Sequence, residues 1–146
     1  MLFGQVLQAG EGQITSRVAA TRAGIPMTVP AMTINKVCLS GLAAIGHADR
    51  SIRLGESSFV VAGGMESMSN APHVLRELRN GSRLGDATLV DVMLHDGLYC
   101  AFDQCTMGES SDLKNRQLGI DRAEQDEWSA ASHERTIAAT ESGAFA

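Results

Sequence analysis

The amino-acid sequence predicts an α/β fold, and three observations support that fold class. Strand-like and helix-like patterns alternate up to Ala62 in the order strand, helix, strand, helix, strand, which is the order of a layered α/β domain. Glycine follows three of these expected elements, at Gly24, Gly55 and Gly63, where turns use its conformational freedom. Hydrophobic residues make up 44% of the 146 residues but aromatic residues only 4%, so we expect an aliphatic core.

Each element is predicted from its periodicity. Apolar or alternating runs bounded by glycine or proline predict three strands: residues 2–8, 31–38 and 57–62. Apolar residues at intervals of three and four predict two helices in the first half and two in the second: residues 13–23, 40–54, 107–118 and 121–142. Asp121 and Glu124 form a capping-box pattern at the start of the last helix. Residues 73–106 show no strong period and are expected to be irregular.

Charge and composition exclude several classes of partner and location. The chain carries 12 basic and 17 acidic residues, a net charge of −5, which argues against a nucleic acid or an anionic membrane as the main partner. No apolar run approaches the ~20 residues of a membrane span, and the first residues lack the pattern of a secretory signal. Three cysteines are an odd number, so we expect free thiols and a cytoplasmic location.

Cys38 is the residue with the clearest chemical potential. It lies between the expected strand 31–38 and the expected helix 40–54. The positive end of a helix dipole favours the thiolate, which is the nucleophilic form of cysteine. Ser40 is a candidate cap for that helix, and Gly41 would let backbone or substrate approach closely. The alternative is that Cys38 is a small hydrophobic residue packed in the core.

A second segment points to the same edge of the predicted sheet. The stretch GGMESMSNAP, residues 63–72, follows a predicted strand, and ligands of open α/β sheets bind at the carboxyl ends of parallel strands. If the strands are parallel, this stretch and Cys38 lie at one edge. Core filling is the alternative role for Met65 and Met68.

Two other patterns carry little chemistry. Cys100 and Cys105, with His95 nearby, loosely resemble a metal site but lack a fourth ligand at a usual spacing, so packing is favoured and no metal is expected. Gly10 and Gly12 provide only half of a dinucleotide-binding fingerprint.

Four segments, in this order, resemble the thiolase family, and more narrowly its bacterial acetyl-CoA acetyltransferases: GQVLQAGEGQ, TINKVCLSGLAAI, VVAGGMESMSNAPH and CTMGESSDLKNRQLGIDRAEQDEWSAASHE. The resemblance covers essentially the whole chain. It implies a layered αβαβα fold, present here as an incomplete N-terminal half plus the start of an inserted loop domain. Residues 1–70 would belong to the N-terminal core domain and residues 71–146 to the loop domain, with the C-terminal domain absent.

The resemblance also implies an activity and a site. Thiolases condense two acetyl-CoA molecules to acetoacetyl-CoA, or cleave 3-ketoacyl-CoA with coenzyme A, as in fatty acid metabolism. Cys38 matches the nucleophile that carries the acyl group as a thioester, and Met107 and Gly108 match a substrate-pocket segment. Coenzyme A thioesters are substrates, and no permanently bound cofactor is implied. The implied assembly is a homo-oligomer, dimer or tetramer, formed through strand 32–37.

The sequence departs from the family pattern in three ways. Thr106 stands where acetoacetyl-type enzymes usually have histidine, and Leu39 stands where many members have glycine. The family's catalytic histidine and second cysteine belong to its second half and match no residue here. We therefore expect the chain alone to be poorly active or inactive. Two alternatives to a thiolase remain open, a non-catalytic thiolase-like subunit that binds acyl-CoA or a partner, and a small α/β redox or binding protein.

Overall fold

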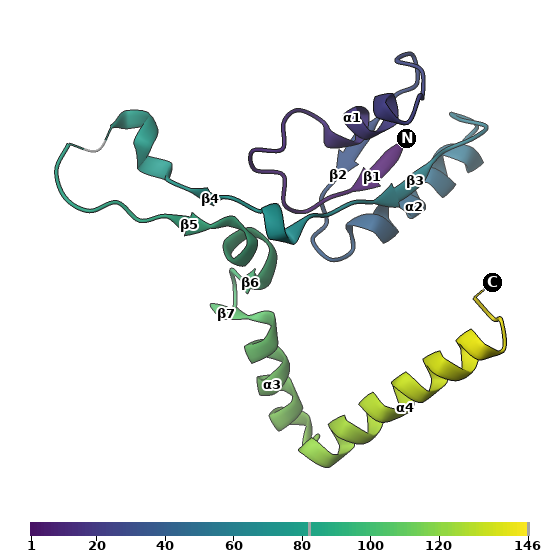
Figure 1. The fold of residues 1–146 in the computed structure, drawn as a ribbon, viewed down its shortest axis with the longest axis vertical. Helices are drawn as coiled ribbons and strands as arrows, with labels where there is room; N and C mark the ends of the chain where they lie inside the picture. Colours follow the sequence, from purple (N-terminus) through teal and green to yellow (C-terminus); the bar gives the residue numbers. More distant parts are fainter. Residues whose placement is uncertain (82, 146) are drawn as a thin grey trace. The chain divides into compact units, whose positions relative to one another are not determined.

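The computed structural model describes residues 1–81 and 83–145. The chain forms two compact units, and the boundary between them in the sequence follows Tyr99. The first unit begins with three strands of one sheet and two helices: β1 (Leu2–Gly4), α1 (Thr15–Arg22), β2 (Met32–Ile34), α2 (Ser40–Arg53) and β3 (Ala62–Gly64). Short elements follow: η1 (Met68–Asn70), β4 (His73–Val74), η2 (Arg76–Asn80), β5 (Val90–Asp91) and η3 (Met93–Leu98). After β6 (Tyr99–Cys100), the second unit continues with β7 (Cys105–Thr106), α3 (Met107–Leu118) and α4 (Arg122–Glu141). Figure 1 shows this order, which confirms the α/β fold class.

The sheet of the first unit is parallel, with strand order β2-β1-β3. Leu2 pairs with Met32 on one side and with Ala62 on the other, so β1 is the central strand. All three strands therefore end at one edge of the sheet. This confirms the condition under which Cys38 and the segment after β3 were expected to lie at the same edge.

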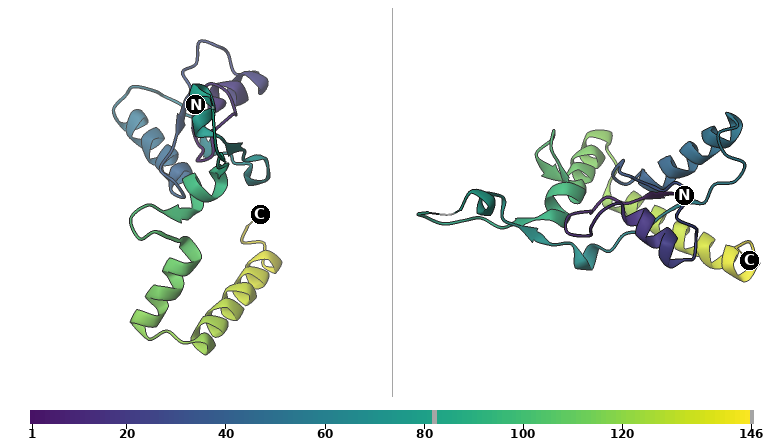
Figure 2. Two further views of the ribbon diagram at one scale, coloured as in Figure 1. Left: turned by 90° about the vertical axis from the view of Figure 1, so that its left-hand side faces the viewer. Right: turned by 90° about the horizontal axis from the view of Figure 1, so that it is seen from above.

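The two helices of this unit cover opposite faces of the sheet, as both views in Figure 2 show. The chain moves from β1 to β2 through α1, and then back across β1 to β3 through α2. Because such crossovers are right-handed, movement in opposite directions places the connecting helices on opposite faces. The buried apolar side chains are few and mostly small: Leu7, Ala20, Ala44, Ala48 and Val92.

The helices match their predicted positions better than the strands do. Helix 13–23 is confirmed as α1, which is followed by Gly24 at φ 81°, and helix 40–54 is confirmed as α2. The strand predicted at 57–62 is misplaced, because the pairing of β3 begins only at Ala62, opposite Leu2. Phe59 is 81% exposed, so this residue of the apolar run does not contribute to the core. The ladder with β1, rather than the apolar run, decides where β3 lies.

The other two strands are shorter than predicted, for the same reason. The run 2–8 forms only β1, and the run 31–38 forms only β2. Beyond Gly4 the chain leaves the ladder, and Gln5 donates its backbone N–H to the Ile34 carbonyl at 3.0 Å. The residues that leave the ladder are those that build the candidate site.

The segment predicted to be irregular contains short paired elements. β4 and β5 form an antiparallel pair in which Val74 lies opposite Val90. Val92 follows β5, is 2% exposed, and donates its N–H to the Pro72 carbonyl at 3.2 Å. This anchor returns the chain to the edge of the sheet, where η3 begins.

The second unit is dominated by α3 and α4, which match the two predicted helices closely. The predicted capping box is confirmed, since the Asp121 side chain accepts from the Glu124 N–H at 2.9 Å and Glu124 bonds back to the Asp121 N–H. Gly119 separates the helices at φ 73°. Among the described residues, none of the helices has the length and apolar character required to span a membrane.

Candidate active site

Cys38 lies on the turn between the end of β2 and the start of α2, and its side chain is exposed. The alternative of a packed core cysteine is therefore wrong. The predicted position just ahead of a helix is confirmed, because α2 begins at Ser40. An exposed thiol at the carboxyl edge of a parallel sheet lies where open α/β proteins bind their ligands.

The turn that presents Cys38 has an unusual backbone. Val37 adopts φ 49°, a left-handed conformation that is rare for a β-branched residue and costs about 1–3 kcal/mol. Several hydrogen bonds hold it there. The Val37 N–H donates to Asn35 Oδ1 at 2.9 Å, and the Val37 carbonyl accepts from Ser40 Oγ at 2.6 Å. The surrounding structure thus fixes the direction in which the Cys38 side chain leaves the turn.

Ser40 has a different role from the predicted helix cap. The N-cap residue of α2 is Leu39, without a side-chain hydrogen bond, and Ser40 is the first helical residue. Its hydroxyl accepts from the Lys36 N–H at 2.8 Å while it donates to the Val37 carbonyl. The hydroxyl therefore bonds to the preceding turn and not to the helix. Ser40 is 4% exposed, so it is a buried polar residue.

Glycines allow the start of α2 to approach the strand edge. A Cβ atom on Gly4 would lie 2.5 Å from the Gly41 nitrogen and 2.7 Å from Ser40 Cβ. A Cβ on Gly64 would lie 3.3 Å from the Gly4 carbonyl oxygen. A Cβ on Gly41 would meet nothing within 4 Å, so the predicted close approach of the backbone does not depend on the missing side chain at that position. Gly4 and Gly64 are the glycines that let the start of α2 and the ends of β1 and β3 come together.

A cavity of about 410 Å³ lies over this edge. Its lining is mostly apolar and comes from four parts of the first unit: Gly4–Leu7, the Val37–Gly41 turn without Leu39, Gly64–Glu66 with Met68, and Met93, Gly97 and Leu98. Met65 and Met68 thus lie on the cavity instead of filling the core. The residue Cys38 is part of this lining, so a molecule in the cavity would lie beside it.

Glu66 connects two walls of the cavity. Its carboxylate accepts from the Val6 N–H at 2.8 Å and from the Leu7 N–H at 3.3 Å. Nearby, buried Gln5 donates to the Leu7 carbonyl at 3.2 Å and accepts from the Thr15 hydroxyl. Sequence reasoning missed both residues. The available signal for Glu66 was an acidic residue directly after a glycine-ended strand.

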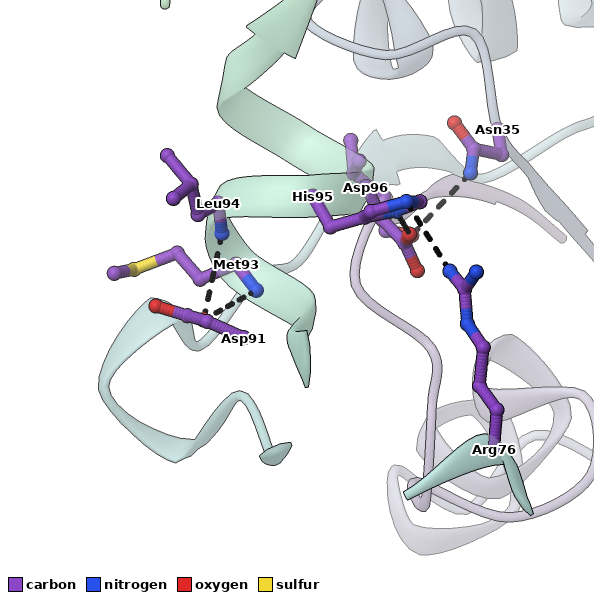
Figure 3. Close-up of polar contacts among 8 residues, drawn as sticks. Asn35, Arg76, Asp91, Met93, Leu94, His95 and Asp96 are labelled. Atoms are coloured by element: carbon purple, nitrogen blue, oxygen red, sulfur yellow. Dashed lines mark hydrogen bonds and ion pairs between the residues drawn. The ribbon is translucent and has the colours of Figure 1, made fainter. Parts of the chain in front are cut away.

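The wall formed by Met93, Gly97 and Leu98 belongs to η3, and Figure 3 shows the polar contacts around this element. Asp91 Oδ1 accepts from the Met93 N–H at 2.9 Å at the start of η3. Arg76 Nη2 lies 3.1 Å from His95 Nε2, and His95 Nδ1 lies 2.7 Å from Asp96 Oδ1. These contacts connect η3 to Arg76 in the segment after β4.

No histidine of the described residues belongs to the cavity lining. His95 is a neighbour of lining residues but is engaged with Arg76 and Asp96. His47 lies on α2, where its Nδ1 is 3.5 Å from Arg50 Nη1. A base for the Cys38 thiol is therefore not identified within the lining.

The predicted substrate-pocket residues Met107 and Gly108 open α3 in the second unit. They lie between the two residues of a capping box, Thr106 and Glu109, which sequence reasoning missed. Thr106 Oγ1 accepts from the Glu109 N–H, and Glu109 Oε2 accepts from the Thr106 N–H at 2.7 Å. Hydrogen bonds from the Thr106 N–H and then its hydroxyl hold the pKa of Glu109 below its ordinary value. The role of Met107 and Gly108 in a substrate pocket stays a prediction.

The structure offers no support for a metal centre. Within residues 1–81 and 83–145, no group of three or more His, Cys, Asp or Glu side chains is placed to hold a metal ion. Cys100 and Cys105 are free thiols. The half-fingerprint glycines Gly10 and Gly12 adopt φ 79° and 92° in the connection before α1, as turn residues do.

Comparison with known proteins gives a consistent result. The family model described as "Thiolase, N-terminal domain" matches residues 1–146. The chain is 51% identical over 146 residues to a protein of Mycolicibacterium smegmatis named "Probable acetyl-CoA acetyltransferase", covering 100% of this chain and 38% of that protein. It is 50% identical over 145 residues to "Acetyl-CoA acetyltransferase 2" of Arabidopsis thaliana, covering 99% of this chain and 36% of that protein.

A third relative completes the pattern. "Acetyl-CoA acetyltransferase" of Pseudomonas aeruginosa is 48% identical over 145 residues, covering 99% of this chain and 37% of that protein. The chain thus spans little more than a third of the length of the curated relatives it matches.

Proposed function

Since the chain belongs to the thiolase family, we propose that it forms part of an acyltransferase in which Cys38 carries the acyl group. The observation that supports this most directly is the exposed Cys38 thiol on the lining of an apolar cavity. The names of the relatives favour acetyl-CoA as the acyl donor.

The proposed reaction has two steps. The Cys38 thiolate attacks the thioester carbonyl of acyl-CoA, the C–S bond to coenzyme A breaks, and the released CoA thiolate takes a proton. The α-carbon of a second acetyl-CoA then gives up a proton to a base and attacks the acyl carbonyl on Cys38; the C–S bond to Cys38 breaks, the Cys38 thiolate is released, and an acetyl group transferred in this way gives acetoacetyl-CoA. In the reverse direction, coenzyme A takes the acyl group from Cys38 after cleavage of a 3-ketoacyl-CoA.

The geometry supports the first step in two ways. Hydrogen bonds that are already formed hold the strained Val37 turn, and so the backbone from which the Cys38 side chain leaves, and such pre-organisation lowers the cost of reaching the reactive geometry. The start of α2 lies beside Cys38, and backbone N–H groups at a helix start favour negative charge. Developing charge on the attacked carbonyl oxygen would benefit from the same field.

The proton acceptor for Cys38 is proposed to be a group other than the described cavity lining, because that lining contains no imidazole and its one carboxylate, Glu66, already accepts from two backbone N–H groups. We therefore expect the 146-residue chain to show little turnover by itself. Met107 and Gly108 are proposed to contact the substrate. The proposed substrates are coenzyme A thioesters, and no permanently bound cofactor is proposed.

We also propose a homo-oligomer formed through residues 32–37, in the cytoplasm. β2 is an edge strand of the described sheet, and Met32 is 50% exposed. Lysine on an edge strand opposes strand pairing between chains. Met32→Lys should therefore reduce the oligomer to monomers in sedimentation analysis, and an unchanged oligomer would contradict this arrangement.

Intact mass spectrometry tests the proposed nucleophile. The protein purified from its source is measured before and after brief exposure to acetyl-CoA, and the modified peptide is mapped. We expect one acetyl group on Cys38, lost in Cys38→Ser and kept in the matched control Cys100→Ser. Acetylation that persists in Cys38→Ser would overturn the assignment.

The same experiment separates the non-catalytic alternative. A thiolase-like binding subunit would retain acetyl-CoA, measured by equilibrium dialysis, without covalent acetylation of Cys38. The absence of a histidine from the described lining is the observation that keeps this second candidate. An acetyl adduct on Cys38 in the protein from its source would exclude it.

A further inference from the structure

Two cysteines outside the candidate site face one another across a small hairpin. Cys100 ends β6 and Cys105 begins β7, and these two strands form a two-stranded sheet. Only four residues connect the strands, and a connection of that length permits only antiparallel pairing. With two residues in each strand, antiparallel pairing sets Cys100 opposite Cys105.

Residues directly opposite in an antiparallel pair have side chains on the same face, with Cβ atoms about 4.5–5.5 Å apart. A disulfide requires Cα atoms about 4.4–6.8 Å apart, which directly opposed strand residues satisfy. The turn is closed by the Gln104 N–H, which donates to the Cys100 carbonyl at 2.9 Å. A disulfide also needs Cβ atoms about 3.5–4.5 Å apart, so the hairpin holds the two cysteines side by side and a small further approach of the two strands would close the bridge.

The two sulfur atoms are in different environments. Cys100 Sγ accepts from the Asp103 N–H at 3.3 Å. Partial burial, and then the negative charges of Asp103 and Glu109, raise the pKa of the Cys105 thiol. Both cysteines are free and half-buried in this structure. Cys100 is thus the sulfur better placed to attack, and Cys105 the one better placed to resolve.

We propose that Cys100 and Cys105 form a reversible oxidative modification site, a dithiol that low-molecular-weight disulfides convert to an intramolecular disulfide. The site does not involve Cys38 and does not rest on the proposed acyl transfer. Its substrate class is a small disulfide such as oxidised glutathione.

The chemistry balances in two exchange steps. The Cys100 thiolate attacks one sulfur of oxidised glutathione, forms a mixed disulfide and releases one glutathione thiolate, which takes a proton. Cys105 then gives up its proton and attacks Cys100 Sγ, which forms the intramolecular bond and releases the second glutathione. The two cysteines lose two electrons, and the glutathione disulfide gains them.

Oxidation would act next to a functional segment. Cys105 directly precedes Thr106, the N-cap of α3, and the predicted pocket residues Met107 and Gly108 follow. A bridge at Cys105 would restrict the hairpin from which α3 begins.

The test uses the full chain with Cys38→Ser, so that only this pair can react, together with the unsubstituted chain. Each protein is equilibrated with glutathione buffers of increasing oxidised share, quenched in acid, alkylated under denaturing conditions and weighed. We expect the loss of two hydrogen masses and of two alkylatable thiols, reversed by reduced dithiothreitol. Peptide mapping should place the bond between Cys100 and Cys105.

Matched variants decide the result. Cys100→Ser and Cys105→Ser, each in the Cys38→Ser background, should gain one glutathione and lose no hydrogen pair. Circular dichroism checks that the helices remain. The proposal is overturned if both thiols stay alkylatable in every buffer, if both carry glutathione without a bridge, or if the bonds formed join different chains. In the unsubstituted chain, a bond from Cys38 to either cysteine would also overturn it.

Discussion

The two units of the chain are stabilised by different kinds of interaction. In the first unit, α2 packs against a parallel sheet, and the small residues Ala44 and Ala48 are buried in the contact. In the second unit, α3 and α4 bury no residue among those described, and Trp128 is 70% exposed. Each of these helices instead begins with a complete capping box.

This difference separates tertiary from local control of structure. Capping boxes satisfy the N–H groups at a helix start with side chains three residues away, so such helices are specified by neighbouring residues. The turn that carries Cys38 depends on contacts from distant parts of the chain, such as Asn35 Nδ2 donating to the Val6 carbonyl at 3.3 Å. Perturbing one unit should therefore leave the other unchanged.

The largest expected effect comes from Gly4→Val. A Cβ at this position would lie 2.5 Å from the Gly41 nitrogen, so α2 must move away from the sheet, at a cost of about 3 kcal/mol or more. Hydrogen exchange should show lost protection in β1 and α2 and unchanged exchange in α3 and α4.

Gly46→Ala is the matched control, because a Cβ on Gly46 meets nothing within 4 Å. Replacing glycine by alanine inside a helix should stabilise α2 by about 0.5–1 kcal/mol. Equal destabilisation by the two substitutions would contradict the close approach at Gly4.

The second prediction concerns the Cys38 turn. Ser40→Ala removes a buried hydroxyl that bonds both Lys36 and Val37. The loss should cost about 1–3 kcal/mol because the Lys36 N–H loses its acceptor, whereas the Val37 carbonyl still accepts from the Ser40 N–H at 3.0 Å. Relaxation of the strained turn should also change the rate at which Cys38 reacts with iodoacetamide. Ser111→Ala in α3, where the hydroxyl is exposed, should leave both the denaturation midpoint and that rate nearly unchanged.

How far the sequence predicted the molecule follows the same division. The start of α4 was predicted from Asp121 and Glu124 because the capping box is a local pattern. The strand at 57–62 was misplaced because its register depends on Leu2, which lies far away in the sequence. Cys38 was identified from its position between two elements, whereas Glu66 was missed because its partners Val6 and Leu7 are about sixty positions away.

The third prediction tests whether α3 depends on its own cap. Thr106→Ala removes the side chain that accepts from the Glu109 N–H, and loss of such a cap costs about 1 kcal/mol. We expect fraying of the first turn of α3, measured by faster hydrogen exchange at the Glu109 N–H, from which the Thr106 side chain accepts. Thr106→Ser keeps an accepting hydroxyl and should restore protection. A loss of protection that spread to β1 would contradict the independence of the two units.

The smallest effect is a pH dependence confined to α3. Hydrogen bonds from Thr106 hold the pKa of Glu109 below its ordinary value. A carboxyl group whose pKa is lower in the folded state adds stability above its unfolded pKa, and this stability is lost as pH falls through the folded value. Helicity of α3 should therefore decrease on acidification below about pH 4.3, the ordinary pKa of glutamate. Glu109→Gln keeps the capping geometry but cannot titrate, so its first turn should stay unchanged across this range. If nuclear magnetic resonance shows the same acid response at Glu109→Gln as in the unsubstituted chain, groups other than this capping box control the start of α3.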